Sequence, residues 1–296
     1  MSSVWVVTAA IITFFCICPS GHAQGPAHEQ QSISASPTDA LLDQAFLDMY
    51  NLKFDDAVNL AQKAKIYNPG DPLPWMAQAC AALFREFDRL HILSSDMFTS
   101  DEKFSARNAQ TWNLAGRKQF DDALSGAERL GKERLARDPD DPRALFVMTL
   151  VSGLRADDAA LIAKKNMTAL SFTKSGNQYA ERLLARHPDY YDAYVATGLG
   201  KYIIGGKAAP VRWMLRLGGL KGDQEEGVKE LRIVAEKGHY LAPYARILLA
   251  FDNLRRKDKQ AARNQFAQLH RQFPGNPLFM AEIEKIDHPA QKAGGN

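Results

Sequence analysis

The sequence predicts an all-α fold, an α-solenoid of antiparallel helical hairpins, and three observations predict it. Apolar residues recur at the helical period through most of the chain, and no run shows the apolar–polar alternation of a surface strand. Helical runs end repeatedly at a proline turn. The composition, with 46% hydrophobic and 24% charged residues, is that of an ordinary folded protein.

The first residues predict an export signal that precedes the fold. An apolar run from Val4 to Cys18 is followed by Pro19 and by a small-x-small triplet that ends at Ala23, so we expect a signal peptide over residues 1–23. The alternative is an uncleaved N-terminal anchor, although the run is shorter than the roughly 20 residues that span a bilayer. We therefore predict an exported protein that is periplasmic or envelope-associated.

The predicted helical domain lies between two polar segments. Residues 24–37 have no apolar period and predict a disordered leader, and residues 287–296 predict a disordered tail. Residues 38–286 form the predicted helical-repeat domain. Its helices are expected at 38–51, 54–67, 72–87, 102–118, 120–137, 141–154, 158–187, 190–204, 224–237, 241–255, 258–273 and 277–286. Asp101 is the expected N-cap of the helix that contains Trp112.

Four proline turns divide this domain into repeats. Each follows a helical run that carries basic residues, and each leads into an Asp- or Pro-containing turn that opens the next helix. The four prolines are Pro69, Pro139, Pro188 and Pro274. Recurrence of one such turn is typical of a repeat array.

Small residues before these prolines indicate the kind of repeat. Ala45, Ala57 and Ala64 precede Pro69 at the intervals of the tetratricopeptide repeat, in which small side chains let two antiparallel helices approach closely. The positions assigned to repeat packing in later units are Phe120, Ala123, Pro139, Pro188, Ala250, Ala262, Phe266 and Pro274. We therefore predict an irregular tetratricopeptide array.

The C-terminal third resembles one divergent family of such repeats. The resemblance lies in the stretch "DAYVATGLGKYIIGG", a basic connector after it, and the stretches "GLKGDQEEGVKELRIVAEKGHYLAPYARILLAF" and "QFPGNPLF". These stretches are similar to the Iml-type outer-membrane-linked proteins of fungi and the tetratricopeptide repeat domain 39 proteins of animals. The resemblance implies an all-helical interaction scaffold without catalysis. This chain is short and carries an export signal, so we expect a bacterial exported member.

The charge balance argues against a nucleic-acid partner. The chain has 37 Lys and Arg against 34 Asp and Glu, whereas nucleic-acid-binding proteins carry a strong basic excess. The local excess lies in a glycine-hinged segment, residues 198–223, interpreted as an insertion between two helices of one repeat. Its candidates for an anion or membrane patch are Lys201, Lys207, Arg212, Trp213, Arg216 and Lys221. A short amphipathic helix there would suit an anionic surface, but docking of its apolar side on the adjacent hairpin is favoured.

The sequence contains no recognised motif of catalysis. Val195 stands where a phosphate-binding loop around Gly200 requires its first glycine, and Tyr202 stands where the loop requires Ser or Thr. Dinucleotide, zinc and nucleophile-elbow motifs are also missing. We therefore predict no enzyme activity, cofactor or metal; the alternative is an exported enzyme whose active site has no recognised motif. Cys80, the one cysteine after the signal, is expected to be a small buried side chain.

A binding groove is the functional site that the repeat predicts. The first helices of successive hairpins line a concave groove in such arrays. The candidate groove positions are Asp39, Leu42, Phe46, Met49, Tyr244, Ile247, Phe251 and Arg255. These side chains are mainly apolar and aromatic, which favours an amphipathic or apolar peptide as the partner. The alternative, left open, is that some of them pack against neighbouring helices. The predicted function is an exported scaffold that binds protein or peptide partners.

Overall fold

The computed structural model describes residues 36–99, 104, 106–207, 215, 216, 219 and 221–289, and the structural statements below concern these residues. They contain twelve α-helices and no strand, so the predicted all-α class is confirmed. The predicted signal peptide and the leader up to residue 35 lie outside the described residues, as does the tail from residue 290.

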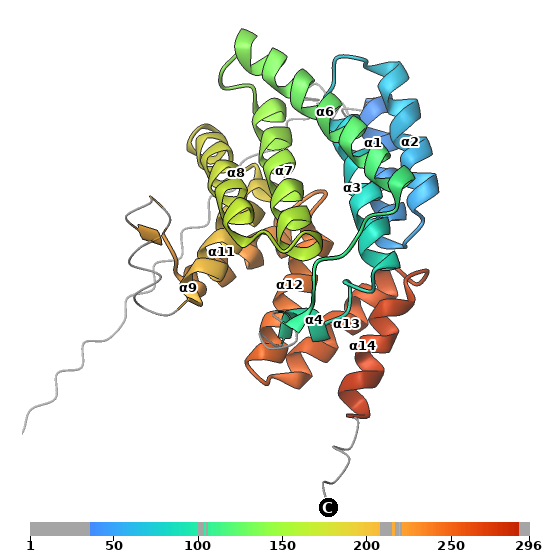
Figure 1. Cartoon of the computed structure of the whole chain (residues 1–296), viewed down its shortest axis with the longest axis vertical. Helices are drawn as coiled ribbons and strands as arrows, with labels where there is room; N and C mark the ends of the chain where they lie inside the picture. Colours follow the sequence, from blue (N-terminus) through green and yellow to red (C-terminus); the bar gives the residue numbers. More distant parts are fainter. Residues whose placement is uncertain are drawn as a thin grey trace, which may run out of the picture. The chain divides into compact units, whose positions relative to one another are not determined.

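Helices follow one another along the chain, joined by turns and loops (Figure 1). In chain order they are α1 (Pro37–Tyr50), α2 (Phe54–Tyr67), α3 (Leu73–Arg89), α4 (Asp96–Thr99), α6 (Leu114–Arg137), α7 (Pro142–Asp157), α8 (Asn166–Arg186), α9 (Tyr194–Gly205), α11 (Gln224–Lys237), α12 (Ala242–Arg255), α13 (Lys259–Gln272) and α14 (Pro277–Asp287). A π-helical turn (Asp158–Ile162) extends α7, and a 3-10 turn (Tyr191–Ala193) leads into α9.

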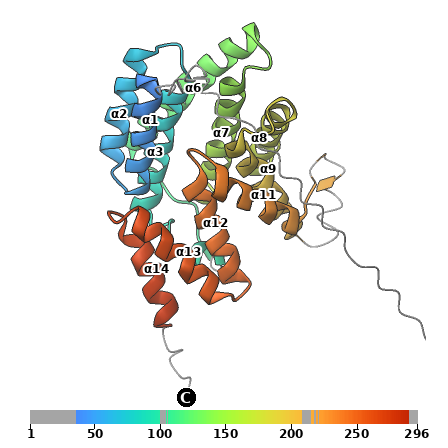
Figure 2. The same ribbon diagram turned by 180° about the vertical axis from the view of Figure 1, so that it is seen from behind.

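The helices pack in pairs that follow the chain order. α1 packs on α2, α3 on α6, α7 on α8, α9 on α11 and α12 on α13, and each pair also packs on the next one. Figures 1 and 2 show these neighbours side by side from opposite directions. One continuous apolar core runs from α1 to α12, and a second cluster joins α12, α13 and α14.

Small and aromatic side chains fill the interfaces within these pairs. The alanine and phenylalanine positions assigned to repeat packing are at most 3% exposed. They are Ala45, Ala57, Ala64, Phe120, Ala123, Ala250, Ala262 and Phe266. Alanine at such positions lets the helix backbones approach without leaving a cavity.

Three of the four proline turns, those after Pro69, Pro139 and Pro274, supply a side-chain cap to the next helix, while the turn after Pro188 supplies none. Asp71 accepts a hydrogen bond from the Leu73 amide at the start of α3 (3.0 Å). Asp141 accepts one from the Ala144 amide at the start of α7 (2.8 Å), and Asn276 caps α14 in the same way. Each side chain thereby satisfies an amide that the first helical turn leaves without a partner.

The helix expected at 120–137 is confirmed as part of α6, which begins earlier, at Leu114. The helix expected at 102–118 is wrong as a continuous helix: Phe104 and Ala106 are helical, but residues 107–113 are not. The side chain of Asn113 caps α6. Asp101, the expected cap, lies outside the described residues.

The long helix predicted at 158–187 is interrupted. Its first residues form the π-helical turn that continues α7, and the chain then reverses at Lys164, whose φ is 55°. Left-handed backbone in a residue other than glycine marks a tight turn rather than helix interior. α8 begins only after this turn.

The first and last helices of the series contact each other. The side-chain amide of Asn276 donates to the carbonyl of Tyr50 at the end of α1 (2.9 Å), and the Tyr50 hydroxyl donates to the carbonyl of Tyr240 (2.9 Å). The Ser95 amide donates to Glu282 of α14 (3.0 Å). Contacts between the two ends bury surface that an open array of hairpins would leave exposed.

Candidate functional site

Four of the eight residues predicted to line the groove are buried in the core. They are Leu42, Phe46, Met49 and Phe251, at 0%, 5%, 8% and 8% exposure. Phe46 contacts the ring of Tyr240, with ring centroids 4.5 Å apart, and Phe251 stacks on Phe98 at 5.0 Å. These side chains therefore pack against neighbouring segments, which is the alternative that the sequence left open.

The other four groove candidates keep accessible surface. Asp39 forms an ion pair with an arginine of α7 (3.0 Å), and Arg255 donates to the carbonyl of Phe98 (2.7 Å). Both charged groups thus have structural partners. Tyr244 and Ile247 are half-buried on α12.

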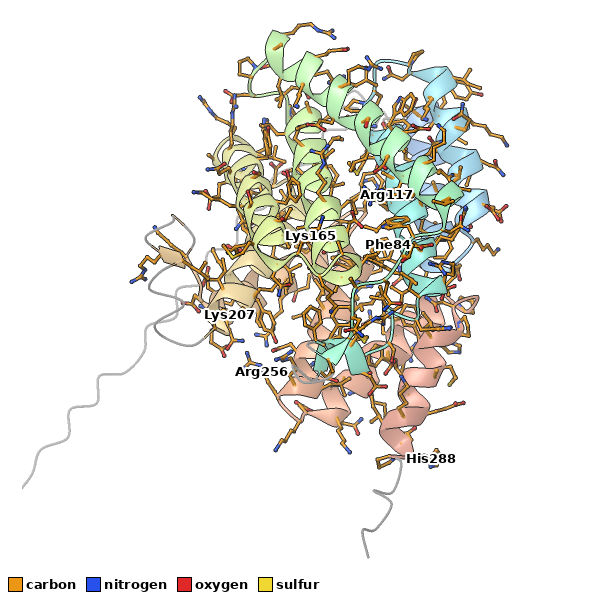
Figure 3. All side chains as sticks on the ribbon, in the orientation of Figure 1. Phe84, Arg117, Lys165, Lys207, Arg256 and His288 are labelled. Carbon is orange, nitrogen blue, oxygen red and sulfur yellow. The ribbon has the colours of Figure 1, made fainter. Side chains whose placement is uncertain are left out.

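Tyr244 belongs to a group of side chains from four helices that the sequence did not identify as a site. This inner cluster is defined by the mutual electrostatic influence of its titratable groups and by one ring contact, and it comprises Tyr50 of α1, Cys80 and Phe84 of α3, Asp157 of α7 and Tyr244 of α12. The rings of Phe84 and Tyr244 meet edge to face, with centroids 6.2 Å apart. Figure 3 labels Phe84 in the middle of the described helices. All members except Cys80 keep some accessible surface.

Burial dominates the electrostatics of the inner cluster. Burial raises the pKa of Asp157 to about 7 and the pKa of Cys80 to about 12. Burial, together with the nearby charge of Asp157, raises the pKa of Tyr244 well above its ordinary value. The carboxyl, thiol and phenol therefore lie within electrostatic reach of one another. Cys80 is buried as the sequence predicts, and its thiol stays protonated at neutral pH.

Asp157 differs from the aspartate that follows it. Asp158 accepts hydrogen bonds from the Trp112 indole (2.7 Å) and from Arg117 (2.9 Å). The side chain of Asp157 makes no hydrogen bond or ion pair with any residue that the structure describes. Buried carboxylates are usually paired because burial of a lone charge is costly. An unpaired carboxyl with a shifted pKa marks a candidate functional group.

The glycines of the basic segment bring α9 and α11 into backbone contact. A Cβ atom on Gly227 would lie 2.5 Å from the carbonyl oxygen of Gly198, and one on Gly205 would lie 2.5 Å from the amide nitrogen of Gln224. Among the described glycines only Gly219 has a positive φ, 85°. The interpretation of this segment as glycine-hinged is therefore corrected: most of its described glycines allow close helix packing.

The basic candidates of this segment fall into separate groups. Lys201 pairs with a buried glutamate of α11, while Arg212 and Trp213 lie outside the described residues. The exposed candidates are Lys207, labelled in Figure 3, Arg216 and Lys221. Leu215 is buried against Ile204 of α9, which is the docking that the sequence favoured for the apolar side. Within the described residues, every helix is too short or too polar to cross a membrane.

Comparisons with known proteins assign no family to the chain. No family model, curated protein or solved structure matches it. No group of three or more potential metal ligands occurs in the described part of the chain. Function is therefore inferred from the packing of the helices and from the inner cluster.

Proposed function

We propose that the helical unit is an irregular array of tetratricopeptide-like hairpins that acts as a non-catalytic scaffold for a protein or peptide partner. The observation that carries this proposal is the packing of helix pairs in chain order through small, fully buried alanines. Stacked hairpins of this kind present extended surfaces for binding other chains. The resemblance of the C-terminal third to a family of such scaffolds agrees with the proposal.

The accessible part of the inner cluster is the proposed contact surface. Core contacts occupy half of the predicted groove positions, but Tyr244 and Ile247 keep accessible surface, as do Tyr50 and Phe84 of the inner cluster. Aromatic side chains offer large contact areas at a low entropic cost and are common at binding interfaces. An amphipathic peptide is the kind of partner that this surface suits.

The proposed setting is the cell envelope. The support is the N-terminal sequence alone, in which an apolar run precedes a cleavage pattern at Ala23. Sequencing of the mature N-terminus from fractionated cells tests it. A chain that starts at Gln24 in the exported fraction is expected, whereas an intact Met1 in a soluble internal fraction would contradict export.

Crosslinked affinity purification from the native cells tests the scaffold function. We expect one protein to be recovered in near-equal amounts with the wild type and to be lost with the variant Tyr244→Ala/Ile247→Ala. Ile66→Ala is the matched control, because Ile66 is 74% exposed at the end of α2, outside the proposed surface. Circular dichroism and urea unfolding verify that the variants fold. Full retention of every partner by the folded double variant, or absence of any stoichiometric partner, would contradict the proposal.

A further inference from the structure

We propose that a notch between α3 and α6 receives the side chain of a glutamate on the partner, whose carboxylate binds Arg85 and Arg89. This inference rests on the proposed function, since it names one group of the partner that the scaffold recognises. The size of the notch, its free donors and its charge support the assignment.

The notch is a hollow of about 190 Å³ where α3 packs on α6, two helices that lie side by side in Figure 1. Its apolar walls include Ala82 of α3 and Ala115 and Gly116 at the start of α6. A Cβ on Gly116 would meet no heavy atom closer than 3.8 Å, so the small residues leave real space there. A cavity of about 150 Å³ holds one benzene ring, whereas pockets for small-molecule ligands are usually about 300 Å³ or larger. The notch therefore has the size of one inserted side chain.

Arg89 lines the notch and keeps two donors free. Its Nε and Nη2 donate to the carboxylate of Glu86 (2.9 and 2.6 Å), and Nη2 also donates to the Thr111 carbonyl (2.8 Å). Neither hydrogen on Nη1 has an acceptor in the described part of the chain. The paired Glu86 is 3% exposed and also accepts the Asn113 amide (2.8 Å), so its charge is matched and it fixes the guanidinium in place.

Arg85 also lines the notch, and its present acid partner is weakly bound. Nη2 donates to Asp55 (2.6 Å), whose side chain is 89% exposed, and Nη1 donates to Gln119 (3.3 Å). Water screens an ion pair at such an exposed site, so an incoming carboxylate can replace Asp55 at small cost. The Nε hydrogen has no acceptor among the residues that the structure describes.

These features together suit a glutamate side chain. The charged groups that line the notch are two guanidinium groups and one carboxylate, which leaves one positive charge for an acid from outside. The methylene groups of a glutamate fit the apolar walls, and its two oxygens fit the planar donor sets of arginine. Phe84 of the inner cluster, labelled in Figure 3, precedes Arg85 on α3, so one bound segment can reach both.

The test uses the full chain labelled with nitrogen-15 and short capped peptides of alanine and leucine as probes. One peptide has a central glutamate, and the other has a glutamine, which has the same shape and no charge. We expect the glutamate peptide to shift the NMR signals of the Gly116 amide and the Gln119 side-chain amide saturably, with a dissociation constant on the order of 1 mM or tighter. The glutamine peptide is expected to shift neither.

Three variants test the named groups. Arg85→Gln should weaken the glutamate peptide about tenfold or more. Asp55→Asn should tighten it about twofold to fivefold, because it releases Arg85 from its competing partner. Gly116→Leu should abolish the response by filling the notch. Arg129→Gln is the matched control, since it removes the same charge from a side chain of α6 that is 59% exposed and lies outside the notch.

Circular dichroism and urea unfolding verify that each variant folds, and the two charge variants decide the question if Gly116→Leu does not. Equal binding of the two peptides, no saturable shift in the wild type, or unchanged affinity in the folded Arg85→Gln variant would overturn the inference. Propionate that binds as tightly as the glutamate peptide would overturn the assignment to a partner side chain. Failure of the glutamate peptide with a retained cellular partner would overturn this inference and leave the scaffold function standing; the reverse result would overturn only the scaffold.

Discussion

At the scale of a single residue, Asp157 makes the stability of the fold depend on pH. Burial raises its pKa from the ordinary 3.8 to about 7, so the folded chain holds a proton that the unfolded chain has already released. Between about pH 4 and pH 7 the folded state therefore binds more protons than the unfolded state. The contribution of Asp157 to stability falls as pH rises through this window and is constant above it.

Asp157→Asn is expected to remove this pH dependence. At about pH 8 the variant should be more stable than the wild type by about 1–2 kcal/mol, less than a full conversion of the pKa shift because the side chain keeps some contact with water. At about pH 4 the two proteins should differ little, since the carboxyl is protonated in the folded state. Urea unfolding at both pH values checks this expectation. A difference in stability that does not change with pH would contradict it.

Among the charged side chains, we expect loss of Arg143 to lower the free energy of unfolding most. Its guanidinium makes two bonds to Asp71 (2.9 and 2.6 Å) and one to Asp39 (3.0 Å), and Asp71 is only 2% exposed. Arg143→Met should lower the free energy of unfolding by about 3 kcal/mol, because it leaves the Asp71 carboxylate buried without its cation.

Arg143→Lys separates geometry from charge. A lysine keeps the positive charge but cannot form the two-pronged contact, so it should restore only part of the lost stability in urea unfolding. A lysine variant as stable as the wild type would show that charge alone matters at this position.

At the scale of helices, the closest packing in the described chain depends on glycine. Gly227 of α11 and Gly153 of α7 are both inside helices, but a Cβ on Gly227 would meet the Gly198 carbonyl oxygen at 2.5 Å, while one on Gly153 would meet nothing within 4 Å. Gly227→Ala should therefore destabilise the fold by about 1–3 kcal/mol. Gly153→Ala should stabilise it by about 0.5–1 kcal/mol, since alanine favours the helix. Thermal unfolding of both variants tests the contrast, and a neutral Gly227→Ala would exclude tight α9–α11 packing.

Helices and proline turns could be predicted because their causes are local. Asp71 caps the helix that starts two residues later, and such a cap is visible in the sequence itself. The start of α6 could not be predicted in this way. Trp112, just before it, donates its indole N–H to the carboxylate of Asp158 (2.7 Å), a residue that is distant in the sequence. The glycines of α9 were predicted to act as hinges but instead allow close packing against α11, for the same reason. The sequence shows the glycine but not the backbone that approaches it.

At the scale of the whole helical series, contacts between segments that are distant in the sequence decide which groove residues remain accessible. Phe46 has the spacing of a groove residue, but its burial depends on Tyr240, far along the chain. No local sequence pattern predicts that contact. The same limit explains why the sequence did not predict Asp157 as a candidate functional residue. Its carboxyl lacks a partner because of the helices that surround it, and the sequence near it is that of an ordinary helix end.

End contact also predicts that distant helices lose order together. Glu282 accepts the Ser95 amide (3.0 Å) and pairs with Lys285 (2.8 Å), so Glu282→Ala should lower hydrogen-exchange protection in α14 and also in residues 95–99 and at the end of α1. Arg263→Ala is the control, because it breaks only the exposed pair with Asp287 (2.7 Å) between neighbouring helices and should act locally. In an open array each hairpin depends on its neighbours alone, and a change in the last helix would leave the first unaffected. Loss of protection confined to α13 and α14 in the Glu282 variant would therefore mean that the end contact adds nothing to the stability of the first hairpin.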